Sequence, residues 1–292
     1  MVQISDKLKT FLIKNINLLD TYKIEELYKL APKDCRGELS DVLKEIEIDP
    51  FNYVTFIVPY MFTRSSIDAI VIPNGITSIE DAAFYDCSNL TSVIIPSSVT
   101  WIGAGAFEDC TNLTSIIIPD SVTDISSAAF YCCKSLTSVT IGNSVTSIDD
   151  SVFRNCTSLT SIVIPDSVTS IGANAFRGCT SLTSITLGDG VTSIGRYAFE
   201  NCTSLTSITI PDGILSIGEG VFNRCTSLES VTIPDSITDI GAWAFYDCLK
   251  LTEIRFNKTI SQVKREQWYI NKRWHSGSRI TKIICIDGEI EL

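Results

Sequence analysis

The sequence predicts an α+β protein in which a solenoid of parallel β-strands, bent into an arc, follows a helical N-terminal segment. Three observations predict it. Cysteine recurs every 23 residues from Cys87 to Cys248, phenylalanine keeps the same step from Phe84, and leucine keeps it from Leu90. Three columns without a slip indicate a repeat array, and a period in the twenties is typical of solenoids.

One repeat unit accounts for each element of the predicted coil. It reads L-T-S-I-T-[IL]-[PG]-D-[SG]-V-T-S-I-G-x-x-A-F-x-x-C-T-S. Apolar residues at positions 4 and 6 alternate with polar ones, which indicates a strand, and Pro or Gly then ends it. V-T-S-I is a second short extended run, and A-F-x-x-C is too short for more than one helical turn. We expect positions 1, 4, 6, 10, 13, 17, 18 and 21 to point inward and to build one continuous core by stacking.

The repeat unit also carries a family resemblance. L-x-x-I-x-I-P-x-x-V-x-x-I-G-x-x-A-F-x-x-C, over residues 65–256, resembles the BspA-like group of leucine-rich repeats. FNKTISQ (256–262) and IICIDGEI (283–290) resemble the segment after the last repeat and the closing strand of that group, with Val263 where Trp is common. The resemblance implies a right-handed leucine-rich-repeat solenoid that binds partners, mostly in secreted or surface proteins, and has no enzymatic activity in its repeats.

The chain divides into three predicted regions: a helical N-terminal cap (1–64), the solenoid (65–256) and a C-terminal capping segment (257–292). An open solenoid needs a cap at each end because its last coils expose apolar surface. Helical patterns occur at 5–16, 23–31 and 37–48, and the apolar segment 51–62 is expected to pack on the first coil. A separate partner-binding helical module is the alternative for residues 1–64, which also resemble helical leaders of phage or prophage repeat proteins.

Charge bears on the partners and the compartment. The net charge is −11, and residues 65–256 contain 20 acidic and 7 basic side chains. We therefore expect neither nucleic acid nor an anionic membrane as a partner, although solubility alone explains the charge. Charged residues and Asn interrupt the N-terminal segment, so no secretory signal is expected. This predicts a cytoplasmic protein, or a secreted or surface protein if the chain was trimmed.

No catalytic, metal or cofactor constellation is predicted. His275 is the only histidine, which excludes zinc sites of the Cys2His2 kind, and no phosphate-binding glycine pattern occurs. The cysteine column is interpreted as core packing rather than as disulfides or a thiolate metal site. Cys132 falls beside the column and is the best candidate for an exposed thiol.

The outward positions of the strands form the candidate partner-binding surface. Position 5 is apolar in several coils, and an exposed apolar stripe usually marks a contact, although β-branched residues also simply favour strands. Near the C-terminal end the same surface becomes charged. The predicted contact residues are Val71, Ile94, Ile117 and Val163, followed by Glu229, Glu253, Arg255 and Lys282.

An insertion near the C-terminus gives a second candidate. It carries the basic and aromatic cluster Trp268, Tyr269, Arg273, Trp274 and His275. Trp268 and Trp274 are predicted to contact a partner, because aromatic and Arg side chains form binding hot spots. In the alternative interpretation these tryptophans cover the final coil.

These features give three functional hypotheses. The first is a non-catalytic scaffold that presents its repeat surface to another protein of unknown identity. The second is a structural or surface component, such as an adhesin or a part of a phage virion. The third is an enzyme that depends on a reactive thiol. The oligomeric state is left open.

Overall fold

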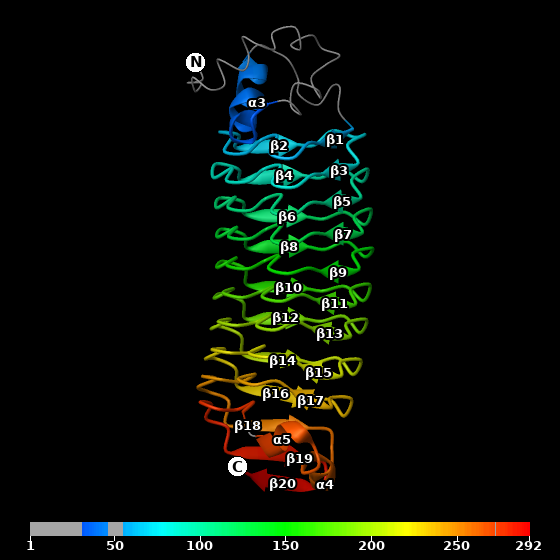
Figure 1. Cartoon of the computed structure of the whole chain (residues 1–292), viewed down its shortest axis with the longest axis vertical. Coiled ribbons are helices and arrows are strands. Elements are labelled where there is room, and N and C mark those ends of the chain that lie inside the picture. The colour runs from blue at the N-terminus through cyan, green and yellow to red at the C-terminus, as the bar shows by residue number, and fades with distance from the viewer. Residues whose placement is uncertain (1–30, 46–54, 272) are drawn as a thin grey trace.

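The computed structural model describes residues 31–45, 55–271 and 273–292. Here the chain winds into a stack of similar coils, each of which contributes one strand to each of two rows (Figure 1). The predicted solenoid of parallel strands is confirmed. The predicted helix at 5–16 and most of the one at 23–31 lie outside the described residues.

The main strand row contains the longer strands, which begin at position 3 of each unit. Equivalent residues of neighbouring strands pair in parallel, as Ser161 does with Ser184, because successive coils repeat the same path. The strands are β2 (Ala69–Val71), β4 (Ser92–Ile94), β6 (Ser115–Ile117), β8 (Ser138–Thr140), β10 (Ser161–Val163), β12 (Ser184–Thr186), β14 (Ser207–Thr209), β16 (Ser230–Ile233), β18 (Glu253–Phe256), β19 (Lys282–Cys285) and β20 (Gly288–Glu291).

The short strand row contains two-residue strands at positions 12 and 13 of the unit, where the sequence predicts the second extended run. They are β1 (Phe56–Ile57), β3 (Ser78–Ile79), β5 (Trp101–Ile102), β7 (Asp124–Ile125), β9 (Ser147–Ile148), β11 (Ser170–Ile171), β13 (Ser193–Ile194), β15 (Ser216–Ile217) and β17 (Asp239–Ile240).

The core confirms the inward positions of the unit. The Phe side chains stack coil upon coil with ring centroids 4.9 to 5.7 Å apart. Each cysteine of the column is buried and donates its S–H to the carbonyl oxygen of the Phe in the preceding coil, as Cys179 does to Phe153 at 3.1 Å. All eleven cysteines are free thiols. The cysteine column is therefore part of the packing, as predicted.

The prediction that Cys132 is an exposed thiol is wrong, because only 9% of its surface is accessible. Cys132 lies at a position of the coil where the backbone is left-handed, with φ of 59°, and Asp109 and Asn155 share this conformation in the neighbouring coils. At this position Asp109 and Asn155 are half-buried, whereas the longer Arg224 side chain, with φ of 59°, is exposed. The Asn155 amide nitrogen lies 3.7 Å from the Cys132 sulfur.

Both strand rows are interrupted. Hydrogen-bonded pairing in the main row is broken between β8 and β10 and between β12 and β14, and in the short row between β7 and β9 and between β13 and β15. The coil that contains β12 and β13 is thus separated in both rows from the coil that contains β14 and β15.

Glycine precedes both breaks in the main row. Gly142 and Gly188 follow β8 and β12 and take the place of the Pro found in the other repeats. A Cβ atom on Gly142 would lie 2.5 Å from the Pro119 carbonyl oxygen, and one on Gly188 would lie 2.6 Å from Pro165. Glycine therefore lets each of these coils approach the preceding coil closely, while the following coil is left without strand pairing.

Leu215 interrupts a ladder of threonine hydroxyls at the break between β13 and β15. At the residue before each short strand, a threonine hydroxyl donates to the carbonyl oxygen of the equivalent residue one coil earlier, as Thr192 does to Thr169 at 3.1 Å. Leu215 occupies this position before β15 and has no hydroxyl. The ladder resumes one coil later, where Thr238 donates to the Leu215 carbonyl at 3.2 Å.

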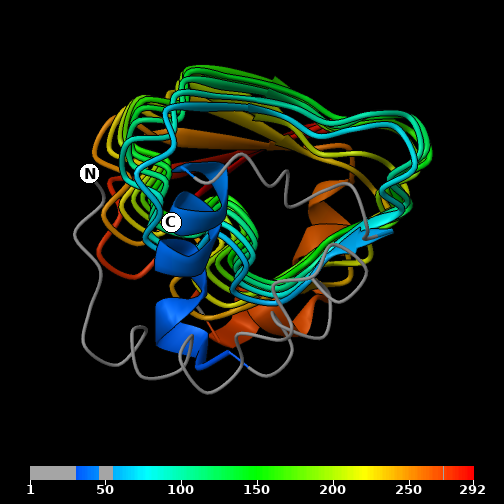
Figure 2. The same cartoon turned by 90° about the horizontal axis from the view of Figure 1, so that it is seen from above.

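At the N-terminal end, η3 (Lys33–Cys35) leads into α3 (Arg36–Glu45), which lies across the first coils (Figure 2). The helix predicted at 37–48 is present within the described residues. The Ser40 hydroxyl donates to the Met61 carbonyl at 2.6 Å. The apolar segment 51–62 packs on the first coil where it is described: β1 pairs with β3, and Phe62 stacks on Phe84 at 4.9 Å.

At the C-terminal end, α4 (Ile260–Val263) and α5 (Gln267–Asn271) separate β18 from β19. The predicted closing strand at 283–290 is a hairpin: β19 extends the main row in parallel, and β20 pairs with it antiparallel. The two edge carboxylates of β20, Glu289 and Glu291, lie 3.0 and 3.5 Å from Lys282. Charged side chains on an edge strand discourage the addition of further strands.

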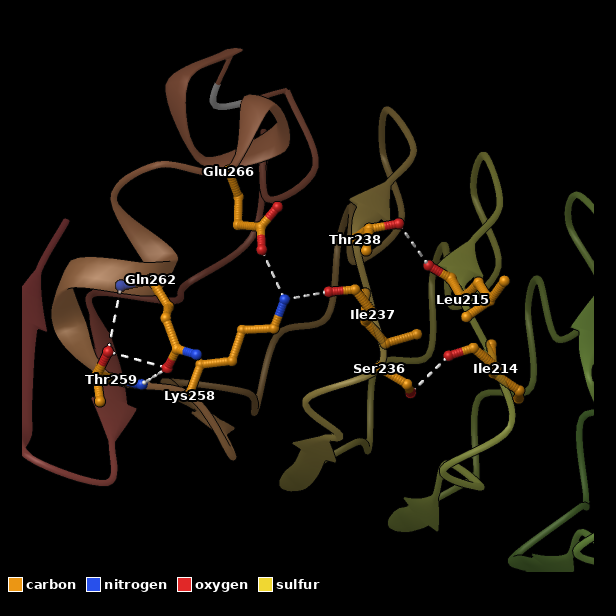
Figure 3. A network of polar contacts seen from close by, with 9 residues as sticks. All are labelled: Ile214, Leu215, Ser236, Ile237, Thr238, Lys258, Thr259, Gln262 and Glu266. Carbon is orange, nitrogen blue, oxygen red and sulfur yellow. Dashed lines mark hydrogen bonds and ion pairs between the residues drawn. The ribbon is translucent and has the colours of Figure 1, made fainter.

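Lys258 links the C-terminal end to the last regular coil by a hydrogen bond and an ion pair (Figure 3). In several interior coils a serine hydroxyl donates to a carbonyl of the preceding coil, as Ser236 does to Ile214 at 2.7 Å. One coil later the buried Lys258 ammonium donates to the equivalent carbonyl, that of Ile237, and forms an ion pair with Glu266 at 2.6 Å.

Candidate protein-interaction surface

Three neighbouring apolar side chains project from the outer face of the main strand row. Val71, Ile94 and Ile117 are 64%, 60% and 67% exposed, whereas the middle residue of each of these strands is buried. β2 pairs with β4 in register, so Val71 lies beside Ile94, and the pairing of β4 with β6 places Ile117 next in the row. We call these three residues the apolar stripe.

The structure therefore confirms that the apolar stripe is contiguous and faces outward. Adjacent strands lie about 4.8 Å apart, so the three side chains form one continuous surface. Their backbones are fixed by strand pairing and by the buried core beneath them. A partner would meet an ordered surface and would order few groups on binding.

Val163 does not extend the apolar stripe directly. It is 64% exposed, but Thr140 and the break between β8 and β10 separate it from Ile117. A groove of about 590 Å³ lies at this break, lined by Thr137, Ser138, Val139, Thr140, Ile141, Asn143, Thr160, Ser161, Ile162, Val163 and Pro165. The sequence analysis did not predict this groove. Its only signal in the sequence is Gly142, which stands where most repeats have Pro.

The four predicted charged residues lie farther along the main row, and each has an ion-pair partner. Glu229 pairs with Lys250 at 2.9 Å, Arg255 with Glu253 at 2.8 Å, and Lys282 with the carboxylates of β20. The hydrogen bond to Glu289 raises the pKa of Lys282. Exposed pairs of this kind contribute little stability, about 0–1 kcal/mol. They leave this end of the surface polar and nearly balanced in charge.

The prediction that the Trp268 and Trp274 rings contact a partner is wrong, because they are only 2% and 1% exposed. Trp268 stacks on Phe256 with centroids 5.0 Å apart, and Trp274 meets Phe245 edge to face at 6.1 Å. The Trp274 carbonyl accepts a hydrogen bond from the Phe245 amide, as an alanine or valine carbonyl of the next coil does for the other Phe residues of the stack. The two rings cover the final coil, which is the alternative that the sequence left open.

The cysteine column is poorly suited to nucleophilic chemistry. Burial raises the pKa of Cys179 and of Cys248 to about 12, and it raises the pKa of Cys202 and Cys225 as well. A buried, protonated thiol is a weak nucleophile and a weak metal ligand. Within the described residues, His, Cys, Asp and Glu side chains do not gather into a group that could hold a metal ion. Every helix of the same residues is too short or too polar to span a bilayer.

Comparison with known proteins establishes the family. Residues 55–168 and 146–273 match the BspA-type leucine-rich repeat region, in six copies. The chain belongs to the BspA-type leucine-rich repeat family. Proteins of this family generally mediate protein interaction or surface adhesion, and their scaffold is generally non-enzymatic. No curated protein matches the chain.

Several solved bacterial structures resemble this BspA-type protein. A leucine-rich cell surface protein of Faecalibacterium prausnitzii is 33% identical over 69% of this chain and 63% of its own, with a TM-score of 0.49. A leucine-rich repeat protein of Bacteroides ovatus is 28% identical over 80% and 70%, with a TM-score of 0.48. One of T. pallidum is 28% identical over 67% and 82%, with a TM-score of 0.49. The chain thus spans less than two thirds of the F. prausnitzii protein.

Proposed function

We propose that this chain is a non-catalytic scaffold that binds another protein through the apolar stripe. The exposure of Val71, Ile94 and Ile117 side by side is the observation that carries the proposal. Burying a large aliphatic side chain contributes about 1.5–3 kcal/mol, so three neighbours can form the centre of an interface.

A pair of matched double variants tests the stripe. Ile94→Glu with Ile117→Glu introduces two charges into it, whereas Thr186→Glu with Thr209→Glu makes the same change at equivalent, exposed positions of β12 and β14. A photo-crosslinking amino acid at position 71 should capture a reproducible partner from the native host in the wild-type and control backgrounds. The stripe variant should lose it.

All three proteins should unfold at similar temperatures, because the substituted side chains are exposed. Equal capture by the stripe variant and the control, or no reproducible partner with the wild type, would contradict the proposal.

We also propose that α3 and the segment from Phe56 to Phe62 form the N-terminal cap of the solenoid. The proposal is supported by the Ser40 bond to Met61, by the Ser65 hydroxyl, which donates to Asp41 at 2.7 Å, and by the burial of Leu39. Deletion of residues 1–45 should lower the unfolding temperature and expose the end of the core to the dye ANS. A truncated protein as stable as the full chain would favour a separate binding module instead.

A further inference from the structure

An open hollow lies in the turns that follow the first short strands. Its volume is about 550 Å³, and ligand pockets usually measure about 300–1,000 Å³. Tyr60, Tyr85, Asp81 and Glu108 line it together with small Ala, Gly and Ser residues. We call it the turn pocket. It follows β3, β5 and β7 and includes no residue of the apolar stripe, which belongs to the main strand row (Figure 1).

Small residues leave the turn pocket open. Position 16 of the repeat carries Ala82, Gly105 and Ala128 in three successive coils. In a later coil the same position is Gly220, and there the Tyr197 ring of the preceding coil fills the space, because a Cβ on Gly220 would lie 2.3 Å from Tyr197 Cε1. The first atom that a Cβ on Gly105 would meet is instead Oε2 of Glu108, at 2.9 Å. The Glu108 carboxylate therefore lies directly beside the open space.

Glu108 lacks the cation that an equivalent glutamate has. Its side chain is half-buried and has no hydrogen-bond or ion-pair partner among the described residues. Burial, and then the neighbouring Asp109 carboxylate, raise the pKa of Glu108. Glu200 is the equivalent residue four coils later, and it pairs with Arg177 of the coil before it at 3.0 Å. The coil before Glu108 has Tyr85 in place of that arginine.

Tyrosine rings at these turns accept cations of the chain itself. The Arg154 guanidinium lies over the Tyr131 ring, 5.5 Å from its centroid, and the Lys33 ammonium lies over Tyr60 at 4.8 Å. An aromatic face attracts a cation, and arginine makes this contact most often. Tyr85 is half-buried and lines the turn pocket, but no cation of the described residues lies over its ring.

The coils around the turn pocket are strongly acidic. Residues 65–133 contain eight acidic residues and no Lys, Arg or His. Arg64, just before this range, is held in an ion pair with Asp86 at 3.1 Å. A surface of this charge attracts a cationic partner and repels an anionic one.

We propose that the turn pocket binds an arginine side chain of a partner protein, with the guanidinium paired to Glu108 and stacked on Tyr85. A guanidinium suits this pocket better than an ammonium, because it is planar, pairs with a carboxylate through two parallel hydrogen bonds and stacks on aromatic rings. Within the chain, arginine makes each of these contacts separately, Arg177 with Glu200 and Arg154 with Tyr131.

An arginine tripeptide and its neutral analogue test the pocket. The probes are acetyl-Gly-Arg-Gly-amide and the same peptide with citrulline, which keeps the shape of the side chain without its charge. In a ¹³C–¹H correlation spectrum of the full chain with labelled tyrosine rings, single Tyr→Phe variants assign the signals. The arginine peptide should shift those of Tyr60 and Tyr85 with a saturable curve and leave Tyr197 and Tyr246 in place. No saturable shift, or an equal shift with citrulline, would overturn the proposal.

Charge-neutralising variants separate Glu108 from the general negative charge of these coils. Glu108→Gln should weaken binding of the arginine peptide about tenfold, the usual effect of losing a charge-assisted hydrogen bond. Asp68→Asn removes the same charge from an exposed residue that does not line the turn pocket, and should weaken binding far less. Equal weakening by the two variants would show an unspecific attraction and contradict the proposal.

Both variants should fold. Asp68 is exposed, and the Glu108→Gln protein should unfold at the same temperature as the wild type or higher, because burial already disfavours the Glu108 charge. A loss of binding without a loss of stability then reports on the pocket itself.

Two further probes check the identity of the ligand. The arginine peptide should bind more tightly than acetyl-Gly-Lys-Gly-amide and more tightly than methylguanidinium. Equal or tighter binding of the lysine peptide would overturn the assignment to arginine. Equal or tighter binding of methylguanidinium would identify a free small cation as the ligand and overturn the assignment to a partner protein.

Discussion

The interior coils and the C-terminal capping segment cover apolar surface in different ways. An interior coil uses contacts that recur along the stack: a stacked Phe ring, a cysteine S–H bound to a carbonyl and, except at Leu215, a threonine hydroxyl bound to the coil before it. The capping segment uses contacts that occur once, such as the Lys258–Glu266 ion pair and the edge-to-face contact of Trp274 with Phe245.

The difference shows how stability is distributed along the chain. In a stack of repeats each coil contacts only its neighbours. The free energy of unfolding is therefore roughly a sum of similar contributions from each pair of neighbouring coils. A substitution in an interior coil should therefore weaken the contacts with the coils on both sides. A substitution in the capping segment should weaken only the contacts at the C-terminal end.

High pH should have the largest effect, because it acts on many interior coils at once. Unfolded thiols lose their protons near pH 9, whereas the folded protein holds those of Cys179 and Cys248 up to about pH 12. The contribution of these thiols to the free energy of unfolding is thus fully present below pH 9 and is lost as the pH rises toward 12. Each such thiol should lower the folding equilibrium constant about tenfold per pH unit in this window.

Urea unfolding from pH 7 to 11, in the presence of a reductant, measures this slope. Cys179→Ala should make it shallower by the contribution of one proton, which separates the thiol from Tyr and Lys groups that titrate in the same range. Equal slopes for the variant and the wild type would show that the buried thiols do not control alkaline unfolding.

Removal of one ring from the interior should have the next largest effect. Phe153→Ala leaves a cavity between stacked rings and should cost about 3–5 kcal/mol of unfolding free energy. Hydrogen exchange should then rise in the coils on both sides. Trp274→Ala should raise exchange only near the C-terminal end. Equal spread of the two effects along the chain would contradict the neighbour-only description.

Glu266→Gln should have a smaller effect, confined to the capping segment. It leaves the buried Lys258 ammonium without its carboxylate and should cost about 2 kcal/mol, as expected for a hydrogen bond to a charged group. Glu253→Gln is the matched control, because its ion pair with Arg255 is exposed and should be worth less than about 1 kcal/mol. Chemical denaturation of both variants tests whether burial makes this difference.

Leu215→Thr should have the smallest effect on the free energy of unfolding, and it should increase that free energy rather than lower it. A hydroxyl at position 215 can donate to the Thr192 carbonyl and restore the ladder, which should add about 1 kcal/mol of stability. Thr192→Leu should remove an intact rung and cost a similar amount. A Leu215→Thr protein no more stable than the wild type would show that the break between β13 and β15 has another cause.

The same comparison explains how much of the fold could be predicted from the sequence. The inward positions, the parallel strands and the cysteine column could be predicted from the 23-residue period. Each coil repeats the same residue types at the same positions, so equivalent residues of neighbouring coils meet. The apolar stripe also followed, because alternation along a strand decides which side chains face outward.

The contacts that occur only once could not be predicted in this way. Nothing in the repeat indicates that Lys258 reaches the Ile237 carbonyl or that Trp274 closes the Phe stack. Cys132 was misjudged because its place beside the column does not show that Asn155 of the next coil packs against it. The groove between β8 and β10 could not be predicted either. The replacement of Pro by Gly142 is visible in the sequence, but the close approach of Gly142 to the Pro119 carbonyl oxygen is visible only in the structure.

Both rows of strands are interrupted between the coil of β12 and β13 and the coil of β14 and β15. That boundary follows Gly188 and contains Leu215. Its two sides are joined by core packing, by hydrogen bonds of the turns and by side-chain hydrogen bonds such as that of the Tyr197 hydroxyl to Glu219 at 2.6 Å. A solenoid pulled from its two ends in a force experiment should therefore rupture there first. Gly188 and Leu215 mark this boundary in the sequence, because each departs from the residue usual at its position of the repeat.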